Sequence, residues 1–363
     1  MNNSRSKNQD TGLTLSDATQ FSRKALLVIG IVIVTYTVLR MFFIAAVNYY
    51  QAMNPPPPPP PTVGFGRLPI IIFPEQDEKV WPKEFVLETA RNRLPEFPDR
   101  AKVFSMQMPA PSLLADERAR NLASRYGFND QPEMLSPTHY RWIKYQPLEA
   151  IFEVNLVNFN FSLRTDYQTR SELLTSREVP DKHDAVQAVR SFLRKSDSLP
   201  EDIATASGDI SYKRTLAGEL MPAVSLSDAN FVQVDIDRTP IDGDLRMFSP
   251  KGQQGIVSAV VTGVLRGDEQ IVQMEYYHQK VEYSLFHTYP LKPIAQAWAE
   301  LQANQGFVAS GEALEEAVIR EVTLGYFDSF EDQPFLQPVY VFSGDDDFMA
   351  YVSAIDSSYV VIQ

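Results

Sequence analysis

The chain has 363 residues, and its 44% hydrophobic, 11% aromatic and 22% charged residues are the composition of an ordinary folded protein. It contains no cysteine, which excludes disulfides, thiolate metal sites and cysteine nucleophiles. The formal net charge is −13, but the residues up to position 47 carry +3, so −16 falls on the remainder. A region this acidic repels phosphate backbones, and we expect no nucleic acid among its partners.

Residues 1–24 are polar and lack apolar periodicity, which predicts a short cytoplasmic tail. Residues 25–47 form an apolar run with one charge, Arg40. As a helix this run would be about 35 Å long, enough to cross a hydrocarbon core of about 30 Å. The alternative is a cleaved signal peptide, but its apolar core would span only about 7–15 residues and end in a small-x-small site. We therefore predict a retained transmembrane helix.

Basic residues flank only one end of the apolar run. Arg23 and Lys24 lie directly before it, and the next basic residue after Arg40 is Arg67. By the positive-inside rule, the N-terminus lies in the cytoplasm and the C-terminal domains outside. The sequence therefore predicts a single-pass protein of the cell membrane.

Arg40 is unusual because a lipid-facing arginine costs a few kcal/mol. Helix tilt with local thinning of the bilayer is one explanation. The other is a partner helix that offers an acidic group or open carbonyls. The second explanation makes Arg40 a candidate partner-binding residue.

Residues 48–75 are predicted to form a proline-rich stalk. Residues 55–61 are seven consecutive prolines, which form a polyproline II rod about 22 Å long. A docking site for a proline-binding domain is the alternative. Residues 70–73 are apolar and are expected to pack into the domain that follows.

Beyond the stalk, amphipathic helices are predicted at residues 112–126, 181–195 and 291–305. Gly127 and Gly306 follow the first and last of them, as is typical of a left-handed helix end. Strand-like runs follow each helix, at residues 140–145, 151–163, 209–215, 231–238, 254–265, 270–289, 318–327, 335–342, 348–355 and 359–362. The run to residue 289 alternates as a half-buried antiparallel strand does.

These elements predict an α+β fold, in which tandem units each pack one helix on an antiparallel sheet. We place a first helix-on-sheet domain at residues 76–175 and further such units at residues 176–363. The chain has neither a G-x-G-x-x-G fingerprint nor regular β-α-β alternation, which argues against a Rossmann-type fold.

The sequence carries no recognisable catalytic signature. Its four histidines are not spaced as H-E-x-x-H, and there is no G-x-S-x-G, P-loop or S-x-x-K motif. We therefore predict no catalytic residue, no metal ligand and no cofactor.

Two acidic clusters and two aromatic pairs are the candidate binding sites in this sequence. The acidic clusters, at residues 235–244 and 345–347, are interpreted as turns, with calcium binding as the alternative. The pairs Tyr276-Tyr277 and Tyr326-Phe327 are each expected to place one ring inward and one outward. Tyr276 and Phe327 are therefore candidate partner-binding residues, together with Arg40.

The final third contains the segments IAQAWAELQANQGF, EVTLGYF and QPVYVFSGDDDFMAYVSAI. Over residues 231–355 it resembles the YycI/YycH-type extracytoplasmic regulators and, more loosely, PepSY-like domains. The resemblance implies a single-pass protein with a non-catalytic ectodomain that restrains a sensor histidine kinase partly through its membrane helix. The proline stalk and the unit at residues 84–163 depart from that family's pattern.

Together these observations predict a non-catalytic, membrane-anchored extracytoplasmic protein that binds other envelope or membrane proteins and regulates a sensor kinase. An envelope enzyme or peptidase inhibitor, and a structural spacer of a surface or secretion assembly, are the alternatives.

Overall fold

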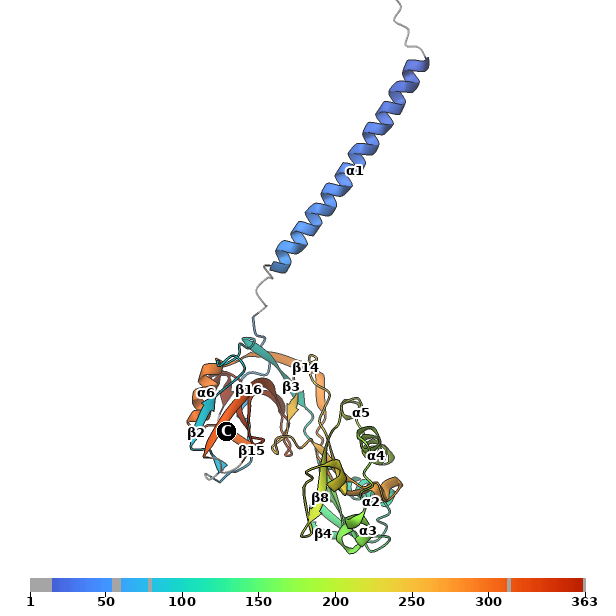
Figure 1. Cartoon of the computed structure of the whole chain (residues 1–363), viewed down its shortest axis with the longest axis vertical. Coiled ribbons are helices and arrows are strands. Elements are labelled where there is room, and N and C mark those ends of the chain that lie inside the picture. The colour runs from blue at the N-terminus through green and yellow to red at the C-terminus, as the bar shows by residue number, and fades with distance from the viewer. Residues whose placement is uncertain (1–14, 54–59, 78–79, 312–314, 362–363) are drawn as a thin grey trace, which may run out of the picture. The chain divides into compact units, whose positions relative to one another are not determined.

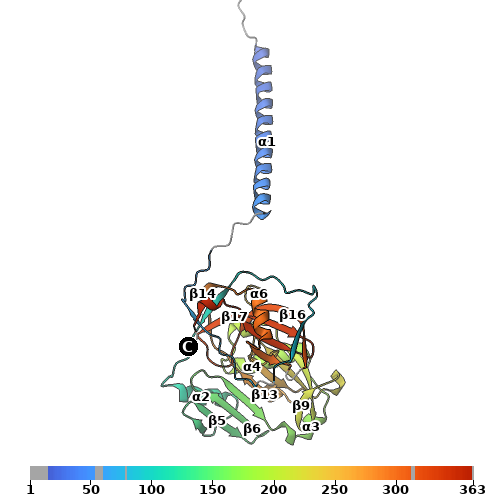
Figure 2. The same ribbon diagram turned by 90° about the vertical axis from the view of Figure 1, so that its left-hand side faces the viewer.

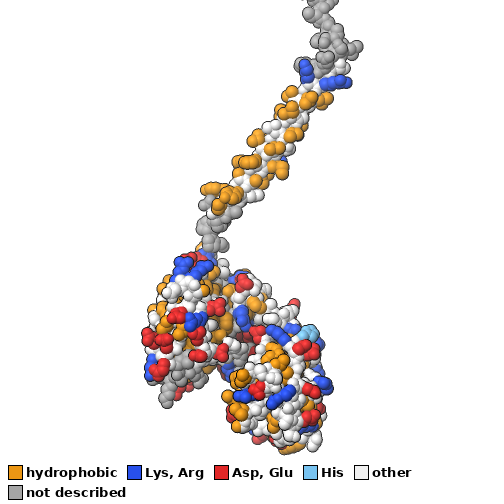
Figure 3. Space-filling model, viewed as in Figure 1, with side chains coloured by type: hydrophobic (Ala, Val, Ile, Leu, Met, Phe, Trp, Pro, Cys, Tyr) orange, Lys and Arg blue, Asp and Glu red, His pale blue; other side chains and the backbone are white. Residues whose placement is uncertain are grey.

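The computed structural model describes residues 15–53, 60–77, 80–311 and 315–361, in two compact units at residues 1–60 and 61–363 (Figure 1). The first unit contains helix α1, Leu15–Met53. Within it Ser22–Tyr50 has a mean hydropathy of 2.3 and is long and apolar enough to cross a membrane. The predicted span at residues 25–47 lies inside this stretch, and apolar side chains line α1 in Figure 3.

Two predictions at the ends of α1 have separate outcomes. Residues 15–24 were expected to be part of an irregular tail, but they continue the helix. Of the stalk predicted at residues 48–75, residues 48–53 continue α1 and Leu68–Pro69 form strand β1, whereas residues 54–59 lie outside the described residues.

The second unit contains two large sheets, and Figures 1 and 2 show them in different parts of it. The larger sheet has nine strands in the order β4-β5-β6-β7-β13-β12-β10-β8-β9, and all neighbours are antiparallel. Its strands are β4 Glu133–Ser136, β5 His139–Lys144, β6 Ala150–Asn155, β7 Phe161–Thr165, β8 Asp209–Leu216, β9 Glu219–Pro222, β10 Phe231–Ile236, β12 Val257–Val261 and β13 Ile271–Tyr276.

Helices α2 (Ala115–Arg125) and α4 (Lys182–Lys195) cover one face of this sheet and share its apolar core. Asp181 caps α4 by accepting a hydrogen bond of 2.8 Å from the Asp184 N–H. Gly127 ends α2 with a φ of 84°, so that Phe128 folds back and is buried. The short helices α3 (Ser171–Thr175) and α5 (Glu201–Ala204) lie in the connections on either side of α4.

The opposite face of the nine-stranded sheet is apolar where Phe231, Val260 and Val272 pack against Tyr167 and Leu173, and it carries polar side chains elsewhere. Because paired residues on neighbouring strands point to the same face, the register places one row of side chains across seven strands. That row is Arg141, Glu153, Ser162, Glu275, Ser258, Asp235 and Asp209. The row contains four acidic residues and one basic residue, so this row is negatively charged.

The second sheet has the strand order β11-β16-β17-β18-β15, with β2 parallel to β16 and β3 paired with both β14 and β17. A separate parallel pair joins β1 to β19. The strands are β1 Leu68–Pro69, β2 Glu84–Leu87, β3 Arg100–Met106, β11 Met247–Phe248, β14 Val281–Pro290, β15 Phe307–Ser310, β16 Glu316–Phe327, β17 Phe335–Gly344, β18 Met349–Ser353 and β19 Val360–Val361. Helix α6 (Ile294–Gln302) packs on one face, and Ile71, Phe73 and Phe248 pack on the other.

The α+β prediction is confirmed, but the elements are distributed differently from the tandem units that we expected. Helices α2 and α4 share one sheet, which contains strands from both sides of residues 175/176. Strands β1, β2 and β3 pair with C-terminal strands, and Ile71 packs against those strands. The predicted domain boundaries themselves stay a prediction.

Two local expectations need correction. The run at residues 270–289 is two strands, because the chain leaves the nine-stranded sheet after Tyr276 and joins β3 from Val281. The helix at residues 291–305 spans only Ile294–Gln302, and Asn304, with a φ of 56°, adopts the left-handed conformation expected of Gly306. Gly306 instead allows the backbone at Tyr351 to approach closely, since a Cβ at residue 306 would lie 2.6 Å from the Tyr351 carbonyl oxygen.

A buried ion cluster joins the two sheets, and we call it the Arg238 cluster: Arg238, Asp202, Asp328, His278 and Gln279. The Arg238 side chain is 0% exposed. Its Nε donates to Asp328 Oδ2 at 2.7 Å and its Nη1 to Asp202 Oδ2 at 2.6 Å. Its Nη2 donates to the Gln279 carbonyl oxygen at 2.7 Å, and His278 Nε2 lies 2.9 Å from Nη1.

We predict that Arg238→Met lowers the free energy of unfolding by about 3–5 kcal/mol, because it leaves Asp328, only 2% exposed, as an uncompensated buried charge. Urea denaturation at neutral pH measures this loss. The matched control is Arg320→Met, which removes exposed pairs with Glu88 and Asp345 and should lower the free energy of unfolding far less. Equal losses in the two variants would show that the cluster has no special structural role.

Candidate functional site

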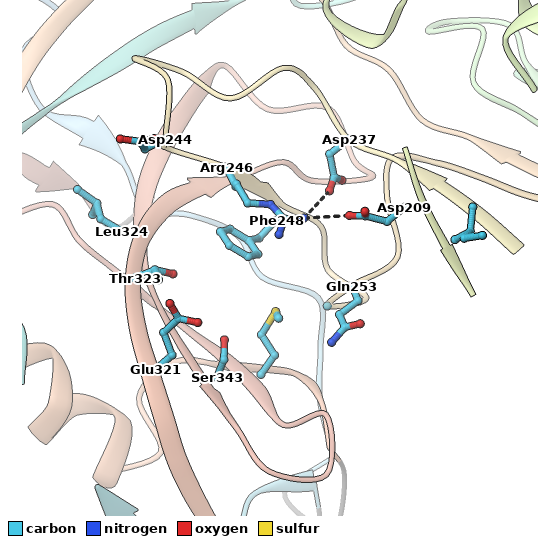
Figure 4. Close-up of a pocket in the computed structure, with 13 residues that line it drawn as sticks. Asp209, Asp237, Asp244, Arg246, Phe248, Gln253, Glu321, Thr323, Leu324 and Ser343 are labelled. Atoms are coloured by element: carbon cyan, nitrogen blue, oxygen red, sulfur yellow. Dashed lines mark ion pairs between the residues drawn. The ribbon is translucent and has the colours of Figure 1, made fainter. Parts of the chain in front are cut away.

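The polar hollow shown in Figure 4 lies between the two sheets and has a volume of about 590 Å³. We call it the acidic hollow. Asp209 comes from β8 of the nine-stranded sheet, Asp237 directly follows β10 of that sheet, and Glu321 comes from β16 of the second sheet. Asp244 and Arg246 come from the connection between β10 and β11. The hollow therefore forms only when both sheets and this connection are in place.

Local chain geometry explains how these groups meet. Asp209 begins β8 and lies opposite Asp235 on β10, so Asp237 emerges beside it. A tight turn at Asp242-Gly243, with φ angles of 52° and 91°, then reverses the chain. The reversed chain carries Arg246 back toward Asp237, and Phe248 pairs with Phe327 where β11 runs parallel to β16.

Arg246 lies between two carboxyl groups (Figure 4). Its Nη2 is 3.5 Å from Asp209 Oδ2 and 3.9 Å from Asp237 Oδ2. Burial raises the pKa of Asp237 to about 7, although Arg246 opposes the shift. Near neutral pH, Asp237 therefore exchanges a proton while facing the hollow.

Four carboxyl groups and one guanidinium line the acidic hollow, so its net charge is negative. Such a site attracts an ammonium or guanidinium group. Among the described residues that line it, none is histidine or lysine. Across the described part of the chain, no group of three or more histidine, aspartate or glutamate side chains is placed to hold a metal ion.

The structure does not bring the three predicted partner-binding residues together. Arg40 lies on α1 in the first unit, where its side chain is exposed. Tyr276 and Phe327 are 7% and 1% exposed. Phe327 is buried along with Tyr326, because both faces of β16 are covered. The expectation that Tyr276 and Phe327 offer outward rings is therefore wrong.

The acidic cluster at residues 235–244, which the sequence analysis singled out, supplies only two of the residues that line the acidic hollow. Asp237 and Asp244 line it, whereas Asp242 forms an ion pair with Lys102 at 2.7 Å. Asp209, Arg246 and Glu321 were missed, because no local pattern links such distant positions. The second cluster is the hairpin turn that we predicted, and Asp345 pairs there with Arg320.

No protein-family profile matches the chain, and no curated protein sequence matches it. The C-terminal domain of Bacillus megaterium YpeB is similar in structure, with 13% identity, 69% of this chain and 95% of that chain covered, and a TM-score of 0.32. An uncharacterized protein from Eubacterium rectale ATCC 33656 has 10% identity, coverages of 73% and 86%, and a TM-score of 0.31. TM-scores this low carry no argument, so the YycI/YycH-type resemblance stays a prediction.

We predict that Asp237→Asn flattens the dependence of stability on pH. The unfolded carboxyl ionises above about pH 4, whereas the folded one keeps its proton until about pH 7. Wild-type stability therefore falls between these values, and between pH 5 and pH 8 the variant should lose about 2–3 kcal/mol less. Urea titrations at both pH values measure the difference.

Asp346→Asn is the matched control, because it removes a carboxyl from an exposed turn. It should reproduce the wild-type pH dependence. If Asp237→Asn also reproduces it, the carboxyl does not titrate near neutral pH.

Proposed function

We propose that this chain is a non-catalytic, single-pass membrane protein whose folded part, outside the cytoplasm, binds other envelope or membrane proteins. The proposal rests mainly on Ser22–Tyr50, a 29-residue part of helix α1. This part has a mean hydropathy of 2.3, and its most apolar window has no buried side chains. Such a surface is stable only in lipid or against other apolar helices.

The distribution of charge supports a contact role. The basic residues Arg23 and Lys24 precede the apolar stretch, and the residues after position 47 carry −16. The folded part therefore favours partners with basic surfaces and is repelled by anionic headgroups. Regulation of a sensor kinase through the membrane helix, as the YycI/YycH-type resemblance implies, is the finer form of this proposal.

Arg40 gives the membrane helix a means of recognition. A guanidinium in the apolar stretch is stabilised when a partner helix presents a carboxylate or open carbonyls to it. The same residue would be costly in a helix that only anchors the chain.

The enzyme alternative has one observation in its favour. Asp237, with a pKa raised to about 7, faces a hollow that holds other carboxyl groups, as general acids often do. The enzyme alternative predicts that the protein turns over a peptide or glycan substrate and that Asp237→Asn abolishes this turnover. Turnover of envelope peptides or glycans would replace the binding proposal.

We predict that Arg40→Leu reduces recovery of a membrane partner at least fivefold after gentle crosslinking and detergent extraction, because it removes the only charge in the apolar run. The full chain should stay in the membrane pellet after alkaline extraction. Met41→Leu, at the neighbouring position, is the control and should leave recovery unchanged.

Protease treatment of intact cells provides a separate check on orientation. It should remove the folded part, residues 61–363, and leave the membrane helix protected. A folded part that resists protease in intact cells, or a chain released from membranes by alkali, would contradict the proposed function.

A further inference from the structure

Strand β14 has a free edge. Among the described strands it pairs only with β3. On its other side, backbone hydrogen bonding begins at Thr288, whose carbonyl oxygen accepts from the Val63 N–H at 3.1 Å, and the His287 side chain contacts Thr62 and Phe65. The stretch from Val281 to His287 therefore offers backbone donors and acceptors to another strand.

A bulge lies within this free edge. The register passes from Glu282 opposite Ser105 directly to Phe286 opposite Phe104, so residues 283–285 have no partner in β3. Three large apolar side chains are exposed here: Tyr283 at 38%, Leu285 at 49% and Phe286 at 39%. The alternation in the sequence predicts a regular strand, and the inserted residues instead turn apolar side chains toward solvent.

The exposed rings border a hollow of about 630 Å³, which we call the β14 groove. Phe104, 3% exposed, lies between them, with ring centroids 5.9 Å from Tyr283 and 5.6 Å from Phe286. Val281 and Ile241 extend this apolar lining. A hollow with aromatic walls and a mainly apolar exposed surface is typical of a site that takes an apolar side chain.

The polar groups of the groove are held in place. Asp202 is only 13% exposed. It accepts a hydrogen bond of 3.2 Å from the Tyr283 hydroxyl and forms an ion pair with Arg238. Lys102 and Lys280, which also line the groove, form ion pairs with Asp242 and Glu282. Glu201 lines the groove as well and takes part in none of the ion pairs found in the described part of the chain. The rim therefore favours one additional positive charge.

We propose that the β14 groove binds an extended segment of a partner protein that adds to β14 as a strand, with apolar side chains alternating with lysine or arginine. This inference rests on the proposed function and names the surface that serves it. The free edge supplies backbone hydrogen bonds, the aromatic walls take the apolar side chains, and Glu201 meets a basic one. A second copy of this chain is disfavoured, because each copy carries −16 outside the membrane helix.

A defined probe tests the inference on the full chain in nanodiscs of zwitterionic lipid. The probe is a fluorescent nine-residue peptide of alternating leucine and lysine with blocked ends, and its affinity is measured by anisotropy. We expect hydrogen exchange at residues 282–287 to slow when it binds. Methylating alternate backbone amides of the peptide should weaken binding at least tenfold, because it removes strand pairing and keeps the side chains.

Leu285→Asp should weaken binding of the unmodified peptide at least tenfold. The matched control is Met221→Asp on the edge strand β9, where the apolar side chain is similarly exposed at 43%, and binding there should change less than twofold. Thermal melts confirm that both variants stay folded. Equal binding of the methylated peptide, equal losses in both variants, or unchanged exchange at residues 282–287 would each overturn the inference.

Crosslinking in native membranes separates failure of the groove from failure of the proposed function. The cysteine-free chain allows a single photoreactive label at Ser284→Cys, with Ser191→Cys on α4 as the control position. An adduct at position 284 that the alternating peptide displaces supports the inference. Adducts at position 191 alone, or an adduct of two copies at position 284, overturn it and leave the proposed function standing. No adduct at either position overturns both.

Discussion

The buried guanidinium of Arg238 is the constraint on which the arrangement of the two sheets depends. Removing an arginine from water is costly unless nearly all of its donors find acceptors. Those acceptors come from α5, from the connection between β13 and β14, and from Asp328 just after β16. Burial alone would raise the pKa of Asp202, but the hydrogen bond from His278 and the charge of Arg238 hold the pKa of that carboxyl well below its usual range.

Both hollows border this cluster, but their chemistry differs. Asp237, which lines the acidic hollow, directly precedes Arg238, whereas Asp202 and His278 line the β14 groove. The acidic hollow offers carboxyl groups around one arginine. The β14 groove offers aromatic rings beside an unpaired strand edge. Both favour basic ligands, and both include residues in or directly beside the Arg238 cluster.

Prediction from the sequence succeeded where neighbouring residues decide the structure. Asp181 starts α4, Gly127 ends α2, and the acidic run at residues 345–347 forms a hairpin turn. It failed where distant segments decide. Alternation across residues 270–289 predicted one strand, but the chain leaves the nine-stranded sheet after Tyr276 and joins β3 from Val281. Within the second of these strands, residues 283–285 form a bulge that has no partner in β3. Two of the five charged residues of the acidic hollow, Asp237 and Asp244, could be predicted from the sequence, because both lie in one local acidic cluster.

The sequence by itself determined the apolar helix, the α+β class and the strongly acidic character of the folded part, because each follows from composition or from periodicity within a few turns. Only the tertiary structure decided which strands share a sheet. Leu68 pairs with Val360, and Glu84 pairs with Glu316, across almost the whole folded part. Such pairings depend on apolar faces that the chain brings together only when it folds. Both candidate binding sites form from that closure and were therefore invisible in the order of the residues.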